Sequence, residues 1–227
     1  MPTTIREILN EFDIELSGQV KWGQKIISKK CGLYFVAITN DTDKLECWEN
    51  PKINETEIQD WIELVQKCSK TLSVDKKSVS KTDLINRLNS LWLPDETILY
   101  IGKAGPTKKR TIEKRVNEYF KTRLGCNKKH AGGNWINTLS ELNKLTVFYS
   151  EFELSEYHRI EEIETKMIEY FSNNVSAKTK TRLVDKINCF PFANKEIHYK
   201  EKRTKIRKNH GLGNQTIDCG NNWKKEI

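Results

Sequence analysis

The stretch "ILYIGKAG", residues 98–105, decides the fold of this chain. Its apolar first half is typical of a buried strand, and its two glycines mark the place where that strand ends. A continuous apolar and aromatic run, "GLYFVAI" at residues 32–38, predicts a second strand that is buried on both faces. The run "LTVFYSEF" at residues 145–152 predicts a third. These three short strands form the expected framework.

Helical patterns surround the predicted strands. Apolar residues recur at helical spacing in residues 111–124 and 157–171, and shorter helices are predicted at 3–12 and in "AGGNWINTLSEL". Residues 41–95 form a polar insertion with two helical patterns joined by a linker at 69–82. We therefore expect a mixed α/β protein of the α+β class. It has a small, mainly antiparallel three-stranded sheet flanked by helices, with a helical insertion between its first two strands.

The formal net charge of the 227-residue chain is +8, and the excess is local. Between Lys103 and Lys129, ten lysines and arginines accompany only two acidic residues. A second basic run, "KEKRTKIRKNH", lies near the C-terminus. Such clusters fit a polyanion, most often nucleic acid, although a solvated basic face remains the alternative.

Composition also limits the class of protein. No run approaches the roughly 20 apolar residues of a membrane-spanning helix, and the N-terminus lacks the pattern of a secretory signal. We therefore expect a cytoplasmic protein that does not bind a membrane. The six cysteines form no CxxC pair, so we interpret them as free thiols and expect no structural metal cluster.

Two polar residues interrupt apolar helix faces. Glu164 lies within the buried stripe predicted for 157–171, while its neighbours Glu161 and Glu162 are predicted to point to solvent. A carboxylate in such a position is costly unless it is paired or binds a cation, so Glu164 is either a structural ion pair or a metal ligand or acid/base group. Arg115 lies at the edge of the apolar face of 111–124, one turn before Tyr119. Guanidinium and phenol together suit a phosphate oxyanion, or Arg115 pairs with Glu164 or caps a loop.

Together these segments resemble the GIY-YIG nuclease family, and its stand-alone restriction enzymes in particular. "GLY" at 32–34 resembles the first signature tripeptide and "YIG" at 100–102 the second, with Lys103 directly after it. "KRVNEYF" resembles the arginine-bearing helix, "ETKMIEYF" the helix with the metal-binding glutamate, and "FPFANKE" the closing motif with its asparagine. The chain departs from the family pattern in the long insertion between the two tripeptides.

The resemblance implies a nuclease domain over residues 32–195, interrupted by the insertion at 41–95. Residues 1–31 are then an N-terminal extension and residues 196–227 a basic C-terminal tail. The catalytic residues implied by the matching positions are Tyr34, Tyr100, Lys103, Arg115, Tyr119, His130, Glu164 and Asn194. Basic residues that would contact the nucleic acid are Lys108, Lys109, Arg110, Arg123, Lys128 and Lys129.

The resemblance further implies a metal-dependent DNA endonuclease, with Glu164 holding one Mg²⁺ or Mn²⁺ ion. Tyr34 or Tyr100 would accept the proton of the attacking water if nearby Lys103 and Arg115 lower the tyrosine pKa. The expected partner is double-stranded DNA, cleaved in a restriction or defence role, and a homodimer is left open. Two alternatives stay open: a non-catalytic nucleic-acid-binding protein on the same scaffold, and a structure-specific or RNA nuclease.

Overall fold

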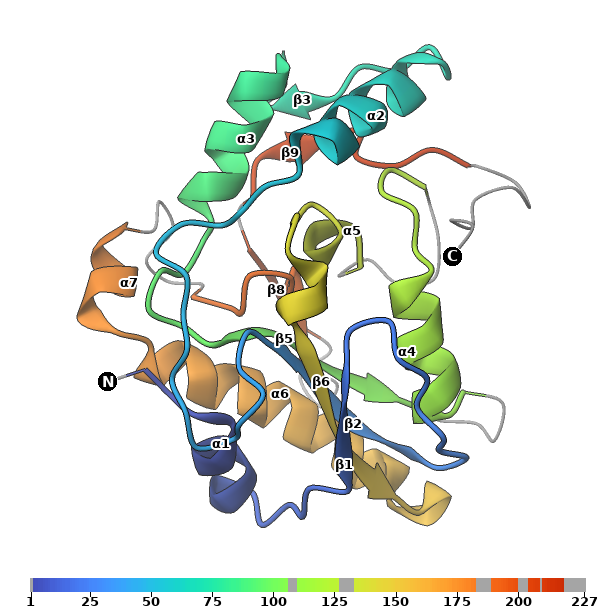
Figure 1. Cartoon of the computed structure of the whole chain (residues 1–227), viewed down its shortest axis with the longest axis vertical. Helices are drawn as coiled ribbons and strands as arrows, with labels where there is room; N and C mark the ends of the chain where they lie inside the picture. Colours follow the sequence, from blue (N-terminus) through green and yellow to red (C-terminus); the bar gives the residue numbers. More distant parts are fainter. Residues whose placement is uncertain are drawn as a thin grey trace.

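The computed structural model of this chain describes residues 2–105, 110–126, 133–182, 189–199, 204–208 and 210–218. It is a mixed α+β protein with antiparallel sheets (Figure 1). The main sheet has four strands in the order β1 (Gly18–Lys21), β6 (Thr146–Phe152), β2 (Cys31–Ala37) and β5 (Ile98–Ala104). The three expected strands are confirmed, but the prediction of a three-stranded sheet was wrong because β1 adds an edge strand.

The central strand β2 pairs with both β5 and β6, and every one of its residues is buried. Tyr34 lies opposite Gly102 in β5 and opposite Tyr149 in β6. The insertion therefore replaces the connection between two paired strands. Such replacement is inexpensive because the entropy of loop closure grows slowly with loop length.

Alternate residues of the sheet face two separate cores. One face carries Leu33, Phe35 and Ile101, and packs against α1 (Ile5–Glu11) and α6 (Tyr157–Asn174). The other face carries Tyr34, Val36 and Tyr100, and packs against α4 (Ile112–Phe120), α5 (Gly133–Ile136) and the insertion. Helix α4 ends at Phe120, earlier than the predicted boundary at residue 124.

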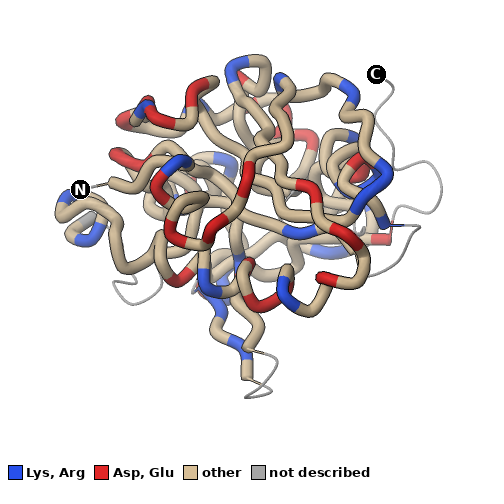
Figure 2. The backbone as a smooth tube through the Cα atoms, turned by 90° about the horizontal axis from the view of Figure 1, so that it is seen from below, with Lys and Arg blue, Asp and Glu red and all other residues tan. Residues whose placement is uncertain are grey.

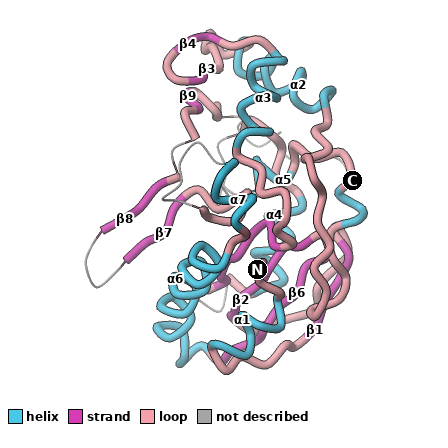
Figure 3. Tube along the Cα trace, turned by 90° about the vertical axis from the view of Figure 1, so that its left-hand side faces the viewer, coloured by secondary structure: helices cyan, strands magenta, loops and turns pink. Residues whose placement is uncertain are grey.

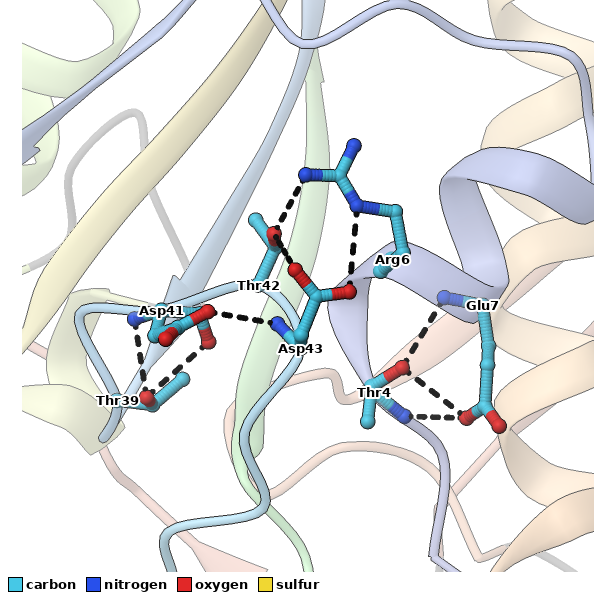
Figure 4. Close-up of polar contacts among 7 residues, drawn as sticks. All are labelled: Thr4, Arg6, Glu7, Thr39, Asp41, Thr42 and Asp43. Atoms are coloured by element: carbon cyan, nitrogen blue, oxygen red, sulfur yellow. Dashed lines mark hydrogen bonds and ion pairs between the residues drawn. The ribbon is translucent and has the colours of Figure 1, made fainter.

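The N-terminal segment is fastened to the body by side-chain contacts. Thr4 and Glu7 form a reciprocal capping box at the start of α1, which satisfies N–H groups that the helix itself leaves unpaired (Figure 4). Arg6 donates to the hydroxyl of Thr42 at 2.9 Å and lies 3.4 Å from Asp43. Helix α1 is thereby held to the loop that follows β2.

The insertion contains the two expected helices, α2 (Glu55–Gln66) and α3 (Lys81–Ser90). The segment predicted as a linker instead forms a tight hairpin of β3 (Ser73–Val74) and β4 (Lys77–Ser78). Strand β9 (Leu212–Gly213) pairs with β3, and these elements form the upper part of the view in Figure 1. The Trp61 indole also donates to the carbonyl of Gln215 at 2.7 Å. The C-terminal segment is therefore packed onto the insertion.

The remaining elements have few apolar residues and were not predicted. They are the 3₁₀ turns η1 (Leu142–Lys144) and η2 (Leu154–Glu156), helix α7 (Ala177–Arg182), and strands β7 (Glu196–Tyr199) and β8 (Thr204–Arg207).

Within the described ranges, none of the helices is long and apolar enough to cross a membrane. Cys31, Cys47 and Cys68 are free thiols as expected. Cys126 is disulfide-bonded, so the prediction for this cysteine was wrong.

Candidate active site

Three tyrosine rings from three elements form a cluster on the α4 side of the sheet. The ring centroids of Tyr34 and Tyr100 are 5.7 Å apart, and Tyr119 lies 5.1 Å from Tyr100 and 6.4 Å from Tyr34. The first two meet because Tyr100 is two residues before Gly102, the partner of Tyr34, and side chains two apart on a strand share a face. Tyr34 and Tyr119 are fully buried, whereas Tyr100 is half-buried.

The glycines of the two tripeptides are required by close packing. A Cβ at Gly102 would lie 2.3 Å from the ring of Tyr100, and one at Gly32 would lie 2.0 Å from the carbonyl oxygen of Ser150. Gly102 therefore lets the tyrosine ring lie flat against its own strand. Gly32 lets β2 approach β6. Both glycines serve contacts within the protein.

Arg115 joins this cluster from α4. The helix is fixed by Thr111, whose side chain accepts a hydrogen bond from the Lys114 N–H, and by buried Ile112 and Val116. The Arg115 side chain is only 17% exposed and its Nη1 lies 3.4 Å from Glu118. Its guanidinium also hydrogen-bonds the Tyr34 phenol. A permanent positive charge thus lies beside the tyrosines.

The electrostatics of the tyrosines differ from the sequence-based expectation. Burial raises the pKa of Tyr34 to about 12 and exceeds the lowering effects of Arg115 and of a hydrogen bond with Tyr100. Burial also raises the pKa of Tyr100 well above its usual value. Arg115 does lower the pKa of both tyrosines, but the condition for a tyrosine base is not met in this structure, because removal of the phenolate from water has the larger effect. At neutral pH these phenols are protonated and can donate hydrogen bonds.

A second cluster lies on the α6 side of the sheet, around Lys103. The Lys103 Nζ atom is 2.6 Å from the Glu164 carboxylate and 3.5 Å from that of Glu161. The prediction that Glu161 points to solvent was wrong, since its side chain is only 15% exposed and also accepts a hydrogen bond from Tyr157 at 3.1 Å. Its place one helical turn before Glu164 is the sequence signal that could have identified it. Two carboxylates therefore share one ammonium group.

The two clusters act on each other. Burial raises the pKa of Glu164, and the positive charges of Lys103 and Arg115 lower it to a smaller extent. In turn, the negative charge of Glu164 raises the pKa of both Tyr34 and Tyr100. The charges of Arg115 on α4 and Glu164 on α6 thus act on the same two phenols.

Asn194 has a structural contact that its sequence motif did not reveal. Its side-chain amide accepts from the Ile101 N–H at 2.9 Å and donates to the Ile101 carbonyl at 2.8 Å. Ile101 lies between Tyr100 and Gly102, on the edge strand of the sheet. Asn194 therefore occupies the open side of β5 and fixes the backbone that carries Tyr100.

Several predicted residues lie elsewhere. Arg110 and Arg123 are exposed, and the positive charge of Arg110 acts on Tyr157, next to the carboxylate pair. Arg123 follows α4, and its carbonyl accepts from the Cys126 N–H in the turn beside the insertion. The other predicted contacts lie outside the described residues: Lys108, Lys109, Lys128, Lys129 and His130.

The donor set at Lys103 fits a hard divalent cation. Mg²⁺ is commonly held by one or two carboxylates together with substrate phosphate oxygens and water. Glu161 and Glu164 supply two partly exposed carboxylates around a point that already holds a positive charge. Across the residues that the structure describes, no group of three or more His, Cys, Asp or Glu side chains is placed to bind a metal.

Comparison with protein-family models, curated proteins and solved structures finds no match to this chain.

Proposed function

We propose that this chain is a metal-dependent endonuclease of the GIY-YIG type, which hydrolyses phosphodiester bonds in double-stranded DNA. One observation carries the proposal: Arg115 and Glu164, the two polar residues that interrupt apolar helix faces, both act electrostatically on the phenols of Tyr34 and Tyr100. The resemblance to the GIY-YIG family assigns catalytic roles to the same four residues. A core that needed only apolar packing would have no use for this combination.

The residues divide into groups that bind phosphate and groups that hold a cation. Arg115 supplies a fixed positive charge, which suits the non-bridging oxygens of the scissile phosphate. Glu164, assisted by Glu161, would hold Mg²⁺ or Mn²⁺. The bound ion supplies Lewis-acid stabilisation of the charge on the phosphate and the leaving oxygen. Lys103, paired with these carboxylates in this structure, would then be available to the phosphate.

The proton of the attacking water is best assigned to a tyrosine in its phenolate form, and we place it on Tyr100 because Tyr34 is fully buried. The negative charge of Glu164 helps to raise the pKa of both tyrosines. Neutralising that charge removes this contribution, while Arg115 continues to favour phenolate. The pKa of Tyr100 therefore falls when Glu164 is neutralised.

Cleavage of plasmid DNA in the presence of Mg²⁺ tests the proposal. We expect Arg115→Ala to lose most of its activity, since removing one charge-stabilising group typically costs about 10²–10³-fold in rate. Lys114→Ala is the matched control, because Lys114 is the exposed neighbour on the same helix. Equal rates for the two variants, or binding of DNA without any cleavage, would refute the nuclease assignment. Binding of DNA without cleavage would favour a non-catalytic binding protein. Preferential cleavage of RNA or branched DNA would favour a structure-specific or RNA nuclease.

A further inference from the structure

Strands β7 and β8 form a two-stranded ribbon that extends away from the rest of the molecule (Figure 3). Glu196 pairs with Arg207, and His198 pairs with Lys205, so these four side chains share one face. The alternate residues form the opposite face. The ribbon therefore has one charged face and one mixed face.

The mixed face anchors the ribbon on α6. Ile197 is buried in the apolar core that includes the inner face of α6. Tyr199 donates a hydrogen bond to Glu169. The hydroxyl of Thr165 also donates to the His198 carbonyl at 3.0 Å. By contrast, all four residues of β8 are exposed. The inner strand is thus fixed to the body, while the outer strand and the charged face meet solvent.

The charged face gathers basic groups around one carboxylate. The Glu196 carboxylate lies 2.8 Å from His198, 2.8 Å from Lys205 and 3.2 Å from Arg207. A single negative charge therefore orients three basic side chains without cancelling them. Over residues 196–207 the sequence holds five lysines and arginines against two glutamates, of which Lys205, Arg207 and Glu196 lie in the described strands. Lys and Arg positions mark the arm that extends below the body in Figure 2, whereas basic and acidic positions alternate over the body.

The root of the ribbon lies beside the candidate active site. Thr165, which binds the ribbon, directly follows Glu164 on α6. Asn194, which fixes the strand of Tyr100, is two residues before β7. The ribbon therefore begins close to Glu164, beside the place proposed for the scissile phosphate.

We propose that the β7–β8 ribbon lies in the major groove of duplex DNA next to the scissile phosphate, with Lys205 and Arg207 on the phosphate backbone. The B-form major groove, about 12 Å wide, admits a two-stranded ribbon. The partner class is B-form duplex, because the major groove of an RNA duplex is too narrow and deep for such an element. This inference rests on the proposed function and names the element that holds its substrate.

Fluorescence anisotropy of a labelled duplex, measured across a salt series without divalent ions, tests the ribbon independently of cleavage. The ribbon variant is Lys205→Gln/Arg207→Gln. The matched control is Lys67→Gln/Lys70→Gln, which removes the same charge from exposed lysines after α2. We expect the ribbon variant to reduce the slope of log K against log[salt] by about two and to weaken binding about 30-fold at about 0.15 M salt. The control should bind like the wild type, and an RNA duplex of the same sequence should bind more weakly than DNA.

Equal affinity and equal salt slope in the two double variants would overturn the ribbon proposal, and so would equal binding of DNA and RNA duplexes. A ribbon variant that changes the oligomeric state while duplex affinity stays unchanged would also overturn it, and would assign the ribbon to self-association. Thermal unfolding of each variant confirms that it is folded. If the wild type binds DNA through the ribbon but never cleaves it, the proposed function fails while the ribbon proposal stands.

Discussion

Glu96 gives the protein a pH-dependent stability that can be worked out from the structure. Its side chain lies where the chain enters β5 and is 1% exposed. It accepts a hydrogen bond from the Ser176 N–H at 2.8 Å, just before α7. Burial raises the pKa of Glu96 from 4.5 to about 7, although the hydrogen bond from the Ser176 N–H lowers it in part, and the charge of Asp95 adds to the increase.

The sign follows from proton binding. Between pH 4.5 and about 7 the folded state keeps the Glu96 proton while the unfolded chain has lost it, so the free energy of unfolding falls as pH rises. Below this window both states are protonated, and above it both are ionised. The shift corresponds to about 3 kcal/mol of stability lost across the window.

Glu96→Gln should remove this loss. Glutamine keeps a carbonyl oxygen for the Ser176 N–H and carries no charge, so the variant should match the wild type near pH 4.5 and exceed it by about 3 kcal/mol at pH 8. Urea denaturation across the pH range measures the difference, and Glu46→Gln, at an exposed position, is the control. Parallel stability curves for wild type and Glu96→Gln would refute the reasoning.

Two further predictions concern the segment that closes the sheet. Asn194→Ala should lower the free energy of unfolding by about 2–5 kcal/mol in urea denaturation, because two backbone groups of Ile101 lose their partner. A decrease under about 1 kcal/mol would mean that β5 keeps its position without this amide. Lys208→Met should cost about 1–3 kcal/mol, since this buried ammonium donates to three consecutive carbonyls, those of Phe190, Pro191 and Phe192. An exposed Lys205→Met control should be neutral, and equal melting curves for these two variants would contradict the role of Lys208.

The sequence predicted the elements whose apolar pattern is strong. The continuous apolar run of β2 and the apolar stripe of α6 can be recognised from the sequence alone. The pairing of β2 with β5 was expected from the resemblance of their two tripeptides to the family signature. Strand β1 was missed because it has four residues, of which Val20 alone is strongly apolar. A strand of this kind is created by its partner β6, and no local signal precedes it.

The same limit applies to the candidate site. Arg115 and Glu164 could be identified because each interrupts an apolar helix face. The backbone contacts of Asn194 could not be predicted, since they depend on how residues far apart in sequence meet. The net direction of the tyrosine pKa shifts could not be predicted either, because nearby cations are visible in a sequence whereas the depth of burial is not.

The rate of plasmid cleavage as a function of Mg²⁺ concentration, compared between Glu164→Gln and Glu162→Gln, tests the central claim most directly. The two glutamates lie on the same helix, but Glu164 contacts Lys103 in the site, whereas Glu162 pairs with Lys166 and is 56% exposed. We expect Glu162→Gln to cleave like the wild type and Glu164→Gln to lose cleavage at every Mg²⁺ concentration. Wild-type cleavage by Glu164→Gln would contradict the account.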